Sequence, residues 1–373
     1  MRLSFFETCK VDRDQKGSEM LRLPGLIDPH VHLREPGATH KEDWMSGTAA
    51  ALAGGFTAVL AMPNTAPPVC DEETLSLALT LASQKAHCDY AQFVGAGADN
   101  AFKLPKLAKK AAGMKMYLDQ TYGPLRLTDQ AAWCKHFERW PINKPLCVHA
   151  ESETLAAVLK LAVEMKRPVH FCHVSRRDEI LQIRAAKERG APVTCEVAPH
   201  HLFLTEADIP AIGSGRSEVR PRLASLADQK ALWDNLDVVD CFASDHAPHT
   251  LAEKDSATPP PGFPGLETAL PLYLTAVNQD LLCLEELIDL CYTNPQRIFG
   301  LPEQPETWVE VDENAVWPIY GEDLHSRAGW TPFEGRLVQG RVSRVVLRGE
   351  EIFKDGQVLS QPGFGRDLRA IIQ

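Results

Sequence analysis

The sequence predicts an α/β fold, a closed (β/α)8 barrel of the TIM type with a small β-rich segment appended to it. Three observations predict this fold: short apolar runs recur along the chain, helix-like patterns separate them, and polar residues gather where the runs end. The strand candidates are residues 23–28, 56–62, 90–95, 113–118, 145–149, 168–173, 192–197 and 238–244.

Helical patterns lie between most of these runs. Residues 154–165 and 178–189 place apolar side chains at i, i+3 and i+4, and Pro or Gly follows each stretch before the next strand. Strands that are apolar nearly throughout are typical of a parallel sheet covered by helices. An open doubly wound sheet is the alternative, but the sequence has no Gly-rich phosphate loop.

The pattern changes after residue 299. Residues 308–311 and 338–353 are β-rich and punctuated by Gly turns, while residues 256–265 are too rich in Pro for a helix or strand and predict a structured loop. We therefore expect three parts. They are an N-terminal segment (1–23) that joins the β-rich part, a barrel (24–300) and a β-rich C-terminal part (301–373).

Composition narrows the function. A net charge of −11 argues against a nucleic-acid surface, and no apolar run is long enough to span a bilayer. The N-terminus lacks the pattern of a signal peptide, and the 10 Cys are scattered, several within apolar runs. These features predict a cytoplasmic protein with free thiols, and neither nucleic acid nor a membrane as a partner.

Metal-ligating side chains follow the predicted strands. His30 and His32 lie at i and i+2 of an extended segment and so face the same side, and His149, His173 and Asp245 end three later strands. A single His is more often a hydrogen-bonded structural residue, but ligands at four strand ends converge on the mouth of a barrel. Imidazole and carboxylate ligands favour zinc.

Several segments resemble the dihydroorotases of the amidohydrolase superfamily, in particular the dihydroorotase domains of animal multifunctional proteins that also carry carbamoyl-phosphate synthetase and aspartate transcarbamoylase. The resemblance runs from about residue 21 to the C-terminus. The segments are PGLIDPHVHLREPG (24–37), AMPNT (61–65), APHHL (198–202), FASDHAPH (242–249) and PPGFPGLE (260–267).

The resemblance implies a two-zinc centre. His30, His32 and Asp245 would hold one zinc, His149 and His173 the other, and Lys115, carboxylated by CO2, would bridge them. Burial lowers the pKa of a Lys and makes its neutral amine available for that reaction. The ions would share a hydroxide, with Asp245 acting first as general base and then as general acid.

A third zinc is also implied. Cys172 and Glu196 would hold it together with a shared imidazole, for which His149 is the candidate. Cys172 in an apolar strand can equally be a packing residue. His200 and His201 receive no metal in this interpretation.

The resemblance further implies a site for the substrate. Arg34 would bind the ring carboxylate, Asn64, Arg220 and His249 would add contacts, and Pro261-Gly262 would line the ring. Residues 119–123 correspond to a loop that closes over the substrate. The family more often has Asn-Glu-Thr-Phe there, so Thr121 matches and Tyr122 replaces Phe.

Three hypotheses follow. The first is a dihydroorotase that interconverts N-carbamoyl-L-aspartate and L-dihydroorotate in pyrimidine synthesis, a homodimer fused to or associated with carbamoyl-phosphate synthetase and aspartate transcarbamoylase. The second is another cyclic-amide hydrolase: a dihydropyrimidinase, hydantoinase or allantoinase. The third is a non-catalytic scaffold of the same fold, although such a scaffold usually loses ligands that this chain retains.

Overall fold

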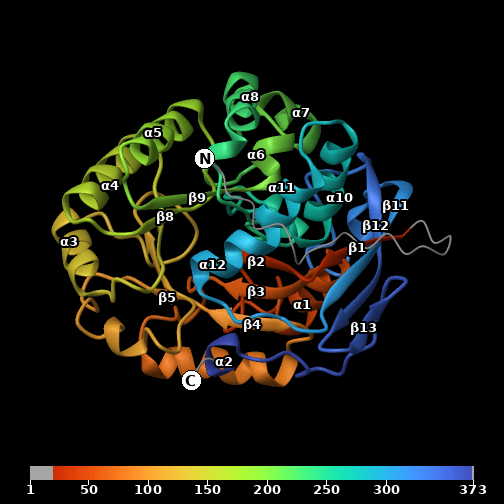
Figure 1. The fold of residues 1–373 in the computed structure, drawn as a ribbon, viewed down its shortest axis with the longest axis horizontal. Coiled ribbons are helices and arrows are strands. Elements are labelled where there is room, and N and C mark those ends of the chain that lie inside the picture. The colour runs from red at the N-terminus through yellow and green to blue at the C-terminus, as the bar shows by residue number, and fades with distance from the viewer. Residues whose placement is uncertain (1–19, 372–373) are drawn as a thin grey trace.

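The computed structural model describes residues 20–371 and shows a parallel barrel surrounded by helices, with an antiparallel sheet at one side (Figure 1). The barrel strands are β2 (Leu26–Val31), β3 (Phe56–Ala61), β4 (Asp89–Gln92), β5 (Val94–Gly95), β6 (Met114–Tyr117), β7 (Leu146–His149), β8 (Val169–Phe171), β9 (Val193–Val197) and β10 (Cys241–Phe242).

The barrel closes through its backbone. Strands β5 to β10 form one ladder of parallel neighbours, and β2, β3 and β4 form another. A parallel bridge between Val31 and His246 joins the last strand position to the first, and Phe93 N, between β4 and β5, donates to Ala61 O. The predicted closed barrel is confirmed, and all its strand ends therefore meet at one mouth.

Helices cover the outside of the barrel (Figure 1). Those between the early strands are long and well capped; Asp43 and Asp71, for example, each accept a bond from a backbone amide in the first turn of the helix that follows. The helices are α1 (Trp44–Ala53), α2 (Glu72–Lys85), α3 (Gln130–Arg139), α4 (Ser152–Glu164), α5 (Arg177–Glu188), α6 (Pro199–Phe203), α7 (Ile209–Ile212), α8 (Leu226–Asp234), α9 (Leu251–Lys254), α10 (Leu266–Asn278), α11 (Leu284–Ile288), α12 (Asn294–Phe299) and α13 (Leu368–Ile371).

The antiparallel sheet consists of β1 (Met20–Pro24), β11 (Trp308–Pro318), β12 (Leu337–Leu347), β13 (Glu350–Lys354) and β14 (Gln357–Val358), in that order. It shares a core with the barrel helices, because Val309 and Val342 pack in the same buried cluster as Leu270 of α10. Most of the expected segment 1–23 lies outside the described residues. Residues 20–23 belong to β1, which pairs with β11.

Two strand predictions need correction. The run predicted as one strand over 23–28 divides at Gly25, so that Leu23 belongs to the antiparallel sheet and only the residues from Leu26 enter the barrel. The run over 90–95 breaks at Phe93. The turn expected at Gly349 within residues 338–353 is confirmed, since Arg348 and Gly349, both at positive φ, separate β12 from β13. The two missed breaks, at Gly25 and Phe93, lie within buried runs. Apolar periodicity does not reveal such breaks because the flanking residues stay buried.

The two ends of the barrel differ in character. Inside it, an apolar layer includes Ile27, Leu60 and Phe93, and Phe299 packs edge-to-face on Phe93. Arg369 of α13 donates to the backbone of Ala112 and Gly300 beside this layer, so the C-terminal residues leave the sheet and pack on the barrel. The polar side chains described below lie at the other end of the barrel.

Residues 256–265 form the predicted loop, which contains neither helix nor strand.

Candidate metal and substrate site

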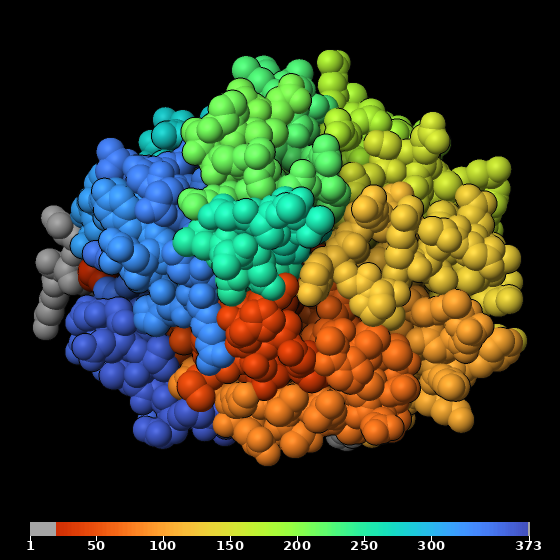
Figure 2. All heavy atoms as spheres, turned by 180° about the vertical axis from the view of Figure 1, so that it is seen from behind, coloured from red at the N-terminus to blue at the C-terminus, as the bar shows by residue number. Residues whose placement is uncertain are grey.

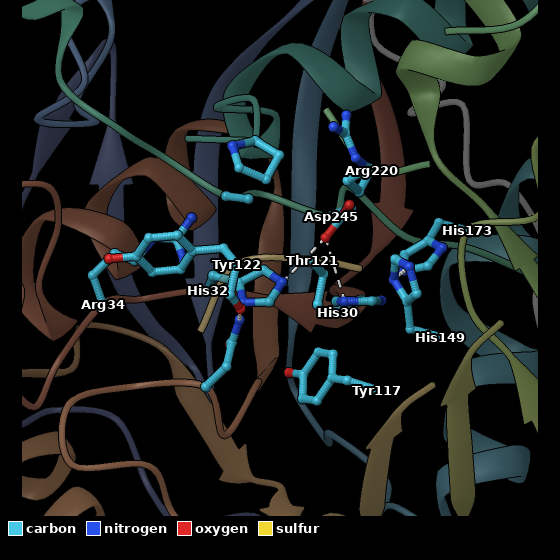
Figure 3. Close-up of a pocket in the computed structure, with 14 residues that line it drawn as sticks. His30, His32, Arg34, Tyr117, Thr121, Tyr122, His149, His173, Arg220 and Asp245 are labelled. Carbon is cyan, nitrogen blue, oxygen red and sulfur yellow. Dashed lines mark hydrogen bonds and ion pairs between the residues drawn. The ribbon is translucent and has the colours of Figure 1, made fainter. Parts of the chain in front are cut away.

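One cavity opens at the carboxyl ends of the barrel strands, and Figure 3 shows the side chains that converge on it. Segments far apart in the sequence, coloured red, yellow-orange and teal in Figure 2, meet near the centre of one face of the molecule. The residues that line the cavity are His30, His32, Arg34, Asn64, Tyr117, Thr121, Tyr122, His149, His173, Arg220, Asp245, Ala247, Pro261 and Gly262.

His30, His32 and Asp245 form one group of ligating side chains. The Nε2 atoms of His30 and His32 lie 3.3 and 3.2 Å from the same Oδ1 of Asp245. His32 Nδ1 lies 2.7 Å from Asn64 Oδ1, which fixes the proton on Nδ1 and leaves the Nε2 lone pair free for a metal. Burial lowers the pKa of His32 to about 4, so this imidazole is neutral.

His149 and His173 form the second group. His149 Nδ1 lies 3.0 Å from His173 Nε2, and Figure 3 shows the two rings turned toward one another. Burial and the neighbouring His149 and Lys115 hold the pKa of His173 well below its ordinary value. Two imidazole nitrogens this close, one on a neutral ring, are suited to share a cation.

Lys115 points into the barrel from β6 and is fully buried. Its Nζ has no hydrogen-bond partner among the described residues, which is costly for an amine unless another group binds there. Burial lowers its pKa as expected, but Cys172 and Glu196 outweigh burial, and the net shift is upward. The expectation that burial alone frees the amine is therefore wrong; nearby metal cations would be needed to favour the neutral form.

A third group lies deeper in the barrel. His30, Cys172 and Glu196 bring one ligand atom each within 4.8 Å of one another. His30 Nδ1 contacts Glu196, whose other oxygen lies 2.9 Å from His170 Nε2. The expected shared imidazole, His149, is wrong: it faces His173 and Glu151. His30 is the imidazole of this third group, because its Nδ1 faces Glu196 while its Nε2 faces Asp245 of the first group.

The backbone is strained at the cavity. Arg34, His173 and Asp245 have φ of 59°, 36° and 45°, a left-handed conformation that is unfavourable for residues other than Gly. Arg34 and Asp245 lie three residues after the ends of β2 and β10, and His173 lies two residues after the end of β8. Strain of this kind concentrates at functional sites, which supports the assignment of this cavity.

Two arginines, Arg34 and Arg220, also line the cavity. Arg34 is 3% exposed; its Nε donates to Pro248 O, and its Nη2 lies 3.1 Å from His249 Nε2. Arg220 is held by Glu218 and by Val219 O, each 2.8 Å away. Gly262 has φ of 144°, and a Cβ there would meet Ala247 O at 2.4 Å, so only Gly fits.

The loop over residues 119–123 is tied down at both ends. Asp119 accepts bonds from Glu151 N and Thr154 Oγ1, and Asn64 Nδ2 donates to Tyr122 O. Asn64 is thus bonded to His32 and to the loop. Within this loop, Thr121 and Tyr122 line the cavity.

Some predicted residues do not line the cavity. His249 lies behind Arg34, while Lys115, Cys172 and Glu196 lie below the cavity in the barrel. His200 and His201 are buried near Asp245 but belong to none of the three groups described above for residues 20–371.

Three further residues were missed by the sequence analysis. Tyr117 lines the cavity, and its place two residues after Lys115 on the same strand face could have revealed it. Lys254 is fully buried and donates to the carbonyls of Glu218, Pro260 and Gly262 at 2.6, 3.0 and 3.2 Å. Lys41 contacts His249 and Tyr122. No sequence pattern marks these two lysines.

The chain is a closed (β/α)8 barrel with clustered metal-ligating side chains at its mouth. Solved structures that share this fold include the following two. L-hydantoinase from Arthrobacter aurescens has a TM-score of 0.89 at 24% identity, covering 93% of this chain and 88% of that one. The inactive dihydroorotase-like domain of the Chaetomium thermophilum CAD-like multifunctional protein has a TM-score of 0.80 at 27% identity, covering 94% and 99%.

Sequence comparisons identify the family. The family model for dihydro-orotase-like proteins matches residues 19–96. Multifunctional protein CAD from Squalus acanthias is 56% identical over 94% of this chain, which spans only 16% of that protein. A dihydroorotase from Pyrococcus abyssi is 38% identical, with 94% of this chain and 89% of that protein covered. The chain belongs to the dihydroorotase family.

Proposed function

We propose that this chain is a zinc-dependent dihydroorotase that interconverts N-carbamoyl-L-aspartate and L-dihydroorotate. One observation carries the proposal: a single cavity is lined both by metal-ligating side chains and by the guanidinium-bearing residues Arg34 and Arg220. Dihydroorotate has a ring amide to be opened and a carboxylate to be bound. An ammonium or guanidinium partner is needed only for the second group.

The described residues fit two metal ions. His30, His32 and Asp245 would hold one, and His149 and His173 the other, with Lys115 as a carboxylated bridge. The unpartnered Nζ of Lys115 and the neutral imidazole of His32 support this set. Bound zinc would supply positive charge that activates water and polarises the ring carbonyl. Cys172, Glu196 and the second nitrogen of His30 would hold a third ion.

Asp245 would carry the proton. Although burial opposes it, His30 and His32 hold the pKa of Asp245 below its ordinary value, so the carboxylate is ionised and can accept a proton from attacking water. During ring closure the same carboxyl group would act in the reverse direction. Asp245 has a positive φ, and its carboxylate lies between His30 and His32.

Arg34 would bind the carboxylate of the ring. Burial lowers the pKa of Arg34 to about 10, so it remains charged at neutral pH. Its Nε donates to Pro248 O, and Arg34 lines the cavity with its guanidinium carbon 5.1 Å from the centre of the Tyr122 ring. Arg220 and Asn64 would complete the contacts, with His249 beside the Arg34 guanidinium. Thr121 and Tyr122 would cover the substrate, and Pro261 and Gly262 would line the ring.

The wider organisation is also a proposal. We propose the three parts 1–23, 24–300 and 301–373, a homodimer in the cytoplasm, and fusion to or association with carbamoyl-phosphate synthetase and aspartate transcarbamoylase. The similarity to part of a multifunctional protein supports that association. Among residues 20–371, the helices lack the length and apolar character needed to cross a bilayer.

The test is a comparison of substrates. Zinc-loaded protein is assayed for ring opening of dihydroorotate, dihydrouracil, hydantoin and allantoin, and zinc is measured per chain. We expect dihydroorotate to be the fastest substrate and at least two zinc ions per chain. Faster turnover of a ring without a carboxylate would instead identify a hydantoinase-type enzyme, and a zinc-free chain inactive on all four would identify a scaffold.

A further inference from the structure

Lys41 is a buried lysine that none of the roles above uses. It lies in the loop that follows β2, 4% exposed, and its backbone amide bonds to Ala38 O. A buried ammonium needs a partner for each of its N–H groups. The structure supplies three: Glu253 Oε1 at 3.0 Å, His249 Nδ1 at 2.9 Å and the hydroxyl of Tyr122 at 3.3 Å.

The first consequence concerns the tautomer of His249. Burial and the cations Arg34, Lys41 and Lys254 hold the pKa of His249 far below its ordinary value, so the ring is neutral. Because Lys41 donates to Nδ1, the single ring proton must be on Nε2. Nε2 lies 3.0 Å from Pro261 O, an acceptor that agrees with this tautomer.

The second consequence concerns Arg34. Its Nη2 lies 3.1 Å from His249 Nε2, and in this tautomer both atoms carry hydrogen. Two N–H groups this close cannot bond to each other, and the Nε2–H of His249 already donates to Pro261 O, so Arg34 Nη2 is left without an acceptor in His249. A substrate carboxylate oxygen is the acceptor that this free guanidinium N–H suits best.

The third consequence concerns the loop over residues 119–123. The Tyr122 ring stands edge-on to His249 with the centroids 4.9 Å apart, and its hydroxyl accepts from Lys41. A Phe, which the family more often has here, would keep the ring contact but lose this bond. The loop of this chain therefore has a polar attachment in addition to the bond from Asn64.

We propose that Lys41 is a positioning residue with two effects. It holds His249 in the Nε2–H tautomer, which keeps the ring from accepting a bond from Arg34 Nη2 and leaves that N–H for the substrate carboxylate, and it attaches the 119–123 loop over the cavity through the Tyr122 hydroxyl. The carboxylate part of this inference rests on the proposed function. The loop part does not, since it needs only the contacts of the substrate-free chain.

The experiment is a double-mutant cycle in the zinc-loaded protein. Lys41→Met removes the ammonium at similar length, and Tyr122→Phe removes one hydroxyl. We expect Lys41→Met to raise KM for dihydroorotate by roughly ten-fold or more, as for truncation of a buried charged partner, with kcat within about three-fold. Tyr122→Phe should raise KM roughly two- to five-fold alone and add nothing to Lys41→Met, because the two residues share one bond.

Hydrogen exchange of residues 119–123 without substrate provides the second measurement. Exchange should be faster in both single variants and no faster in the double variant. Lys110→Met, which breaks only the exposed ion pair with Glu72, is the matched control and should change neither KM nor loop exchange.

The outcomes separate the claims. An unchanged KM in folded, zinc-loaded Lys41→Met overturns the role in carboxylate binding. Equal effects of Tyr122→Phe in both backgrounds, or unchanged loop exchange in Tyr122→Phe, overturn the attachment of the loop, and the latter result does not require Lys41→Met to fold. A native chain without dihydroorotase activity instead overturns the proposed function, while the exchange measurement still decides the loop.

Discussion

The site has a metal-facing side and a substrate-facing side, which are built differently. The metal-facing side consists of His30, His32, His149, His173 and Asp245, with Lys115 below the cavity, on barrel strands or up to three residues beyond them. The substrate-facing side consists of Arg34, Tyr122, Arg220, Pro261 and Gly262, with His249 behind Arg34; Arg34 lies three residues beyond β2 and the others lie farther out in loops. The strands position most of the first set, while side-chain bonds such as Arg34 to Pro248 O and Lys41 to His249 position part of the second.

On the substrate-facing side, two buried lysines connect the loops through hydrogen bonds, where no strand pairing holds them. Lys254 ties the loop of Glu218 to the loop of Pro260 and Gly262, and Lys41 ties His249 to Tyr122. The difference teaches that chemistry and selectivity can vary separately in this fold. Changes to the metal-facing side should affect turnover, whereas changes to the substrate-facing side should affect substrate binding.

The largest effect is expected from Asp245→Asn. The amide cannot accept the proton and is a poorer metal ligand, so kcat should fall by roughly 1,000-fold or more, since general acid–base catalysis alone contributes 100- to 10,000-fold. Steady-state kinetics with a circular dichroism spectrum checks both turnover and fold. Turnover at the wild-type rate would remove Asp245 as the proton carrier.

Lys115→Ala should remove the group proposed to bridge the two metal ions. Loss of the bridge is expected to remove metal and activity together, leaving the barrel folded because the neighbouring strands remain paired. Zinc content per chain is the measurement, and incubation with a short carboxylic acid should partly restore activity. Full zinc and full activity in the variant would show that Lys115 bridges nothing.

Arg34→Lys tests the substrate-facing side. The planar fork is lost while the charge is kept, so KM for dihydroorotate should rise roughly 10- to 100-fold, a cost of about 1.4–2.8 kcal/mol, with kcat less affected. Ring opening of dihydrouracil serves as the internal control because that ring has no carboxylate. A constant KM for dihydroorotate would exclude Arg34 from carboxylate binding.

Lys254→Met should have a smaller effect. The three carbonyls lose their donor, which loosens the loops of Arg220 and Gly262. Each lost hydrogen bond to a charged group costs about 1.5–3 kcal/mol, most of which should appear as a lower free energy of unfolding. The remainder should raise KM roughly three- to ten-fold. Thermal unfolding measured beside KM separates the two costs. If kcat fell and KM did not, Lys254 would belong with the metal-facing side.

The smallest effect is expected from Cys172→Ser. If the deeper group of His30, Cys172 and Glu196 holds an ion, the variant should contain one zinc fewer per chain while turnover changes less than about three-fold, because the reacting atoms lie above it. Metal analysis beside kinetics provides the test. A loss of activity as large as that of Lys115→Ala would place this ion in the reaction.

The comparison also explains what the sequence could predict. His30 and His32 alternate on one strand, and Lys115, His149, His173 and Asp245 end other strands, so the rule that barrel strands end at one mouth brings them together. The loop contacts follow no such rule. Lys41 and Lys254 read as surface charges in the sequence, and only the folded chain shows that each is buried against loop atoms.

The orientation of His30 shows the same limit within the metal-facing side. Its place on the strand was predictable, but which imidazole reaches Cys172 and Glu196 depends on ring rotation and on the depth of each strand in the barrel. The breaks at Gly25 and Phe93 were hidden because both flanks remain buried.

The most direct test of the central claim is a crystal structure of the zinc-loaded chain with dihydroorotate, using anomalous scattering at the zinc edge. We predict one anomalous peak between His30, His32 and Asp245, a second between His149 and His173, carboxylated Lys115 between them, and the ligand carboxylate on Arg34. Anomalous density absent from both positions, or a ligand whose carboxylate faces the histidines, would contradict the division of the cavity into a metal-facing and a substrate-facing side.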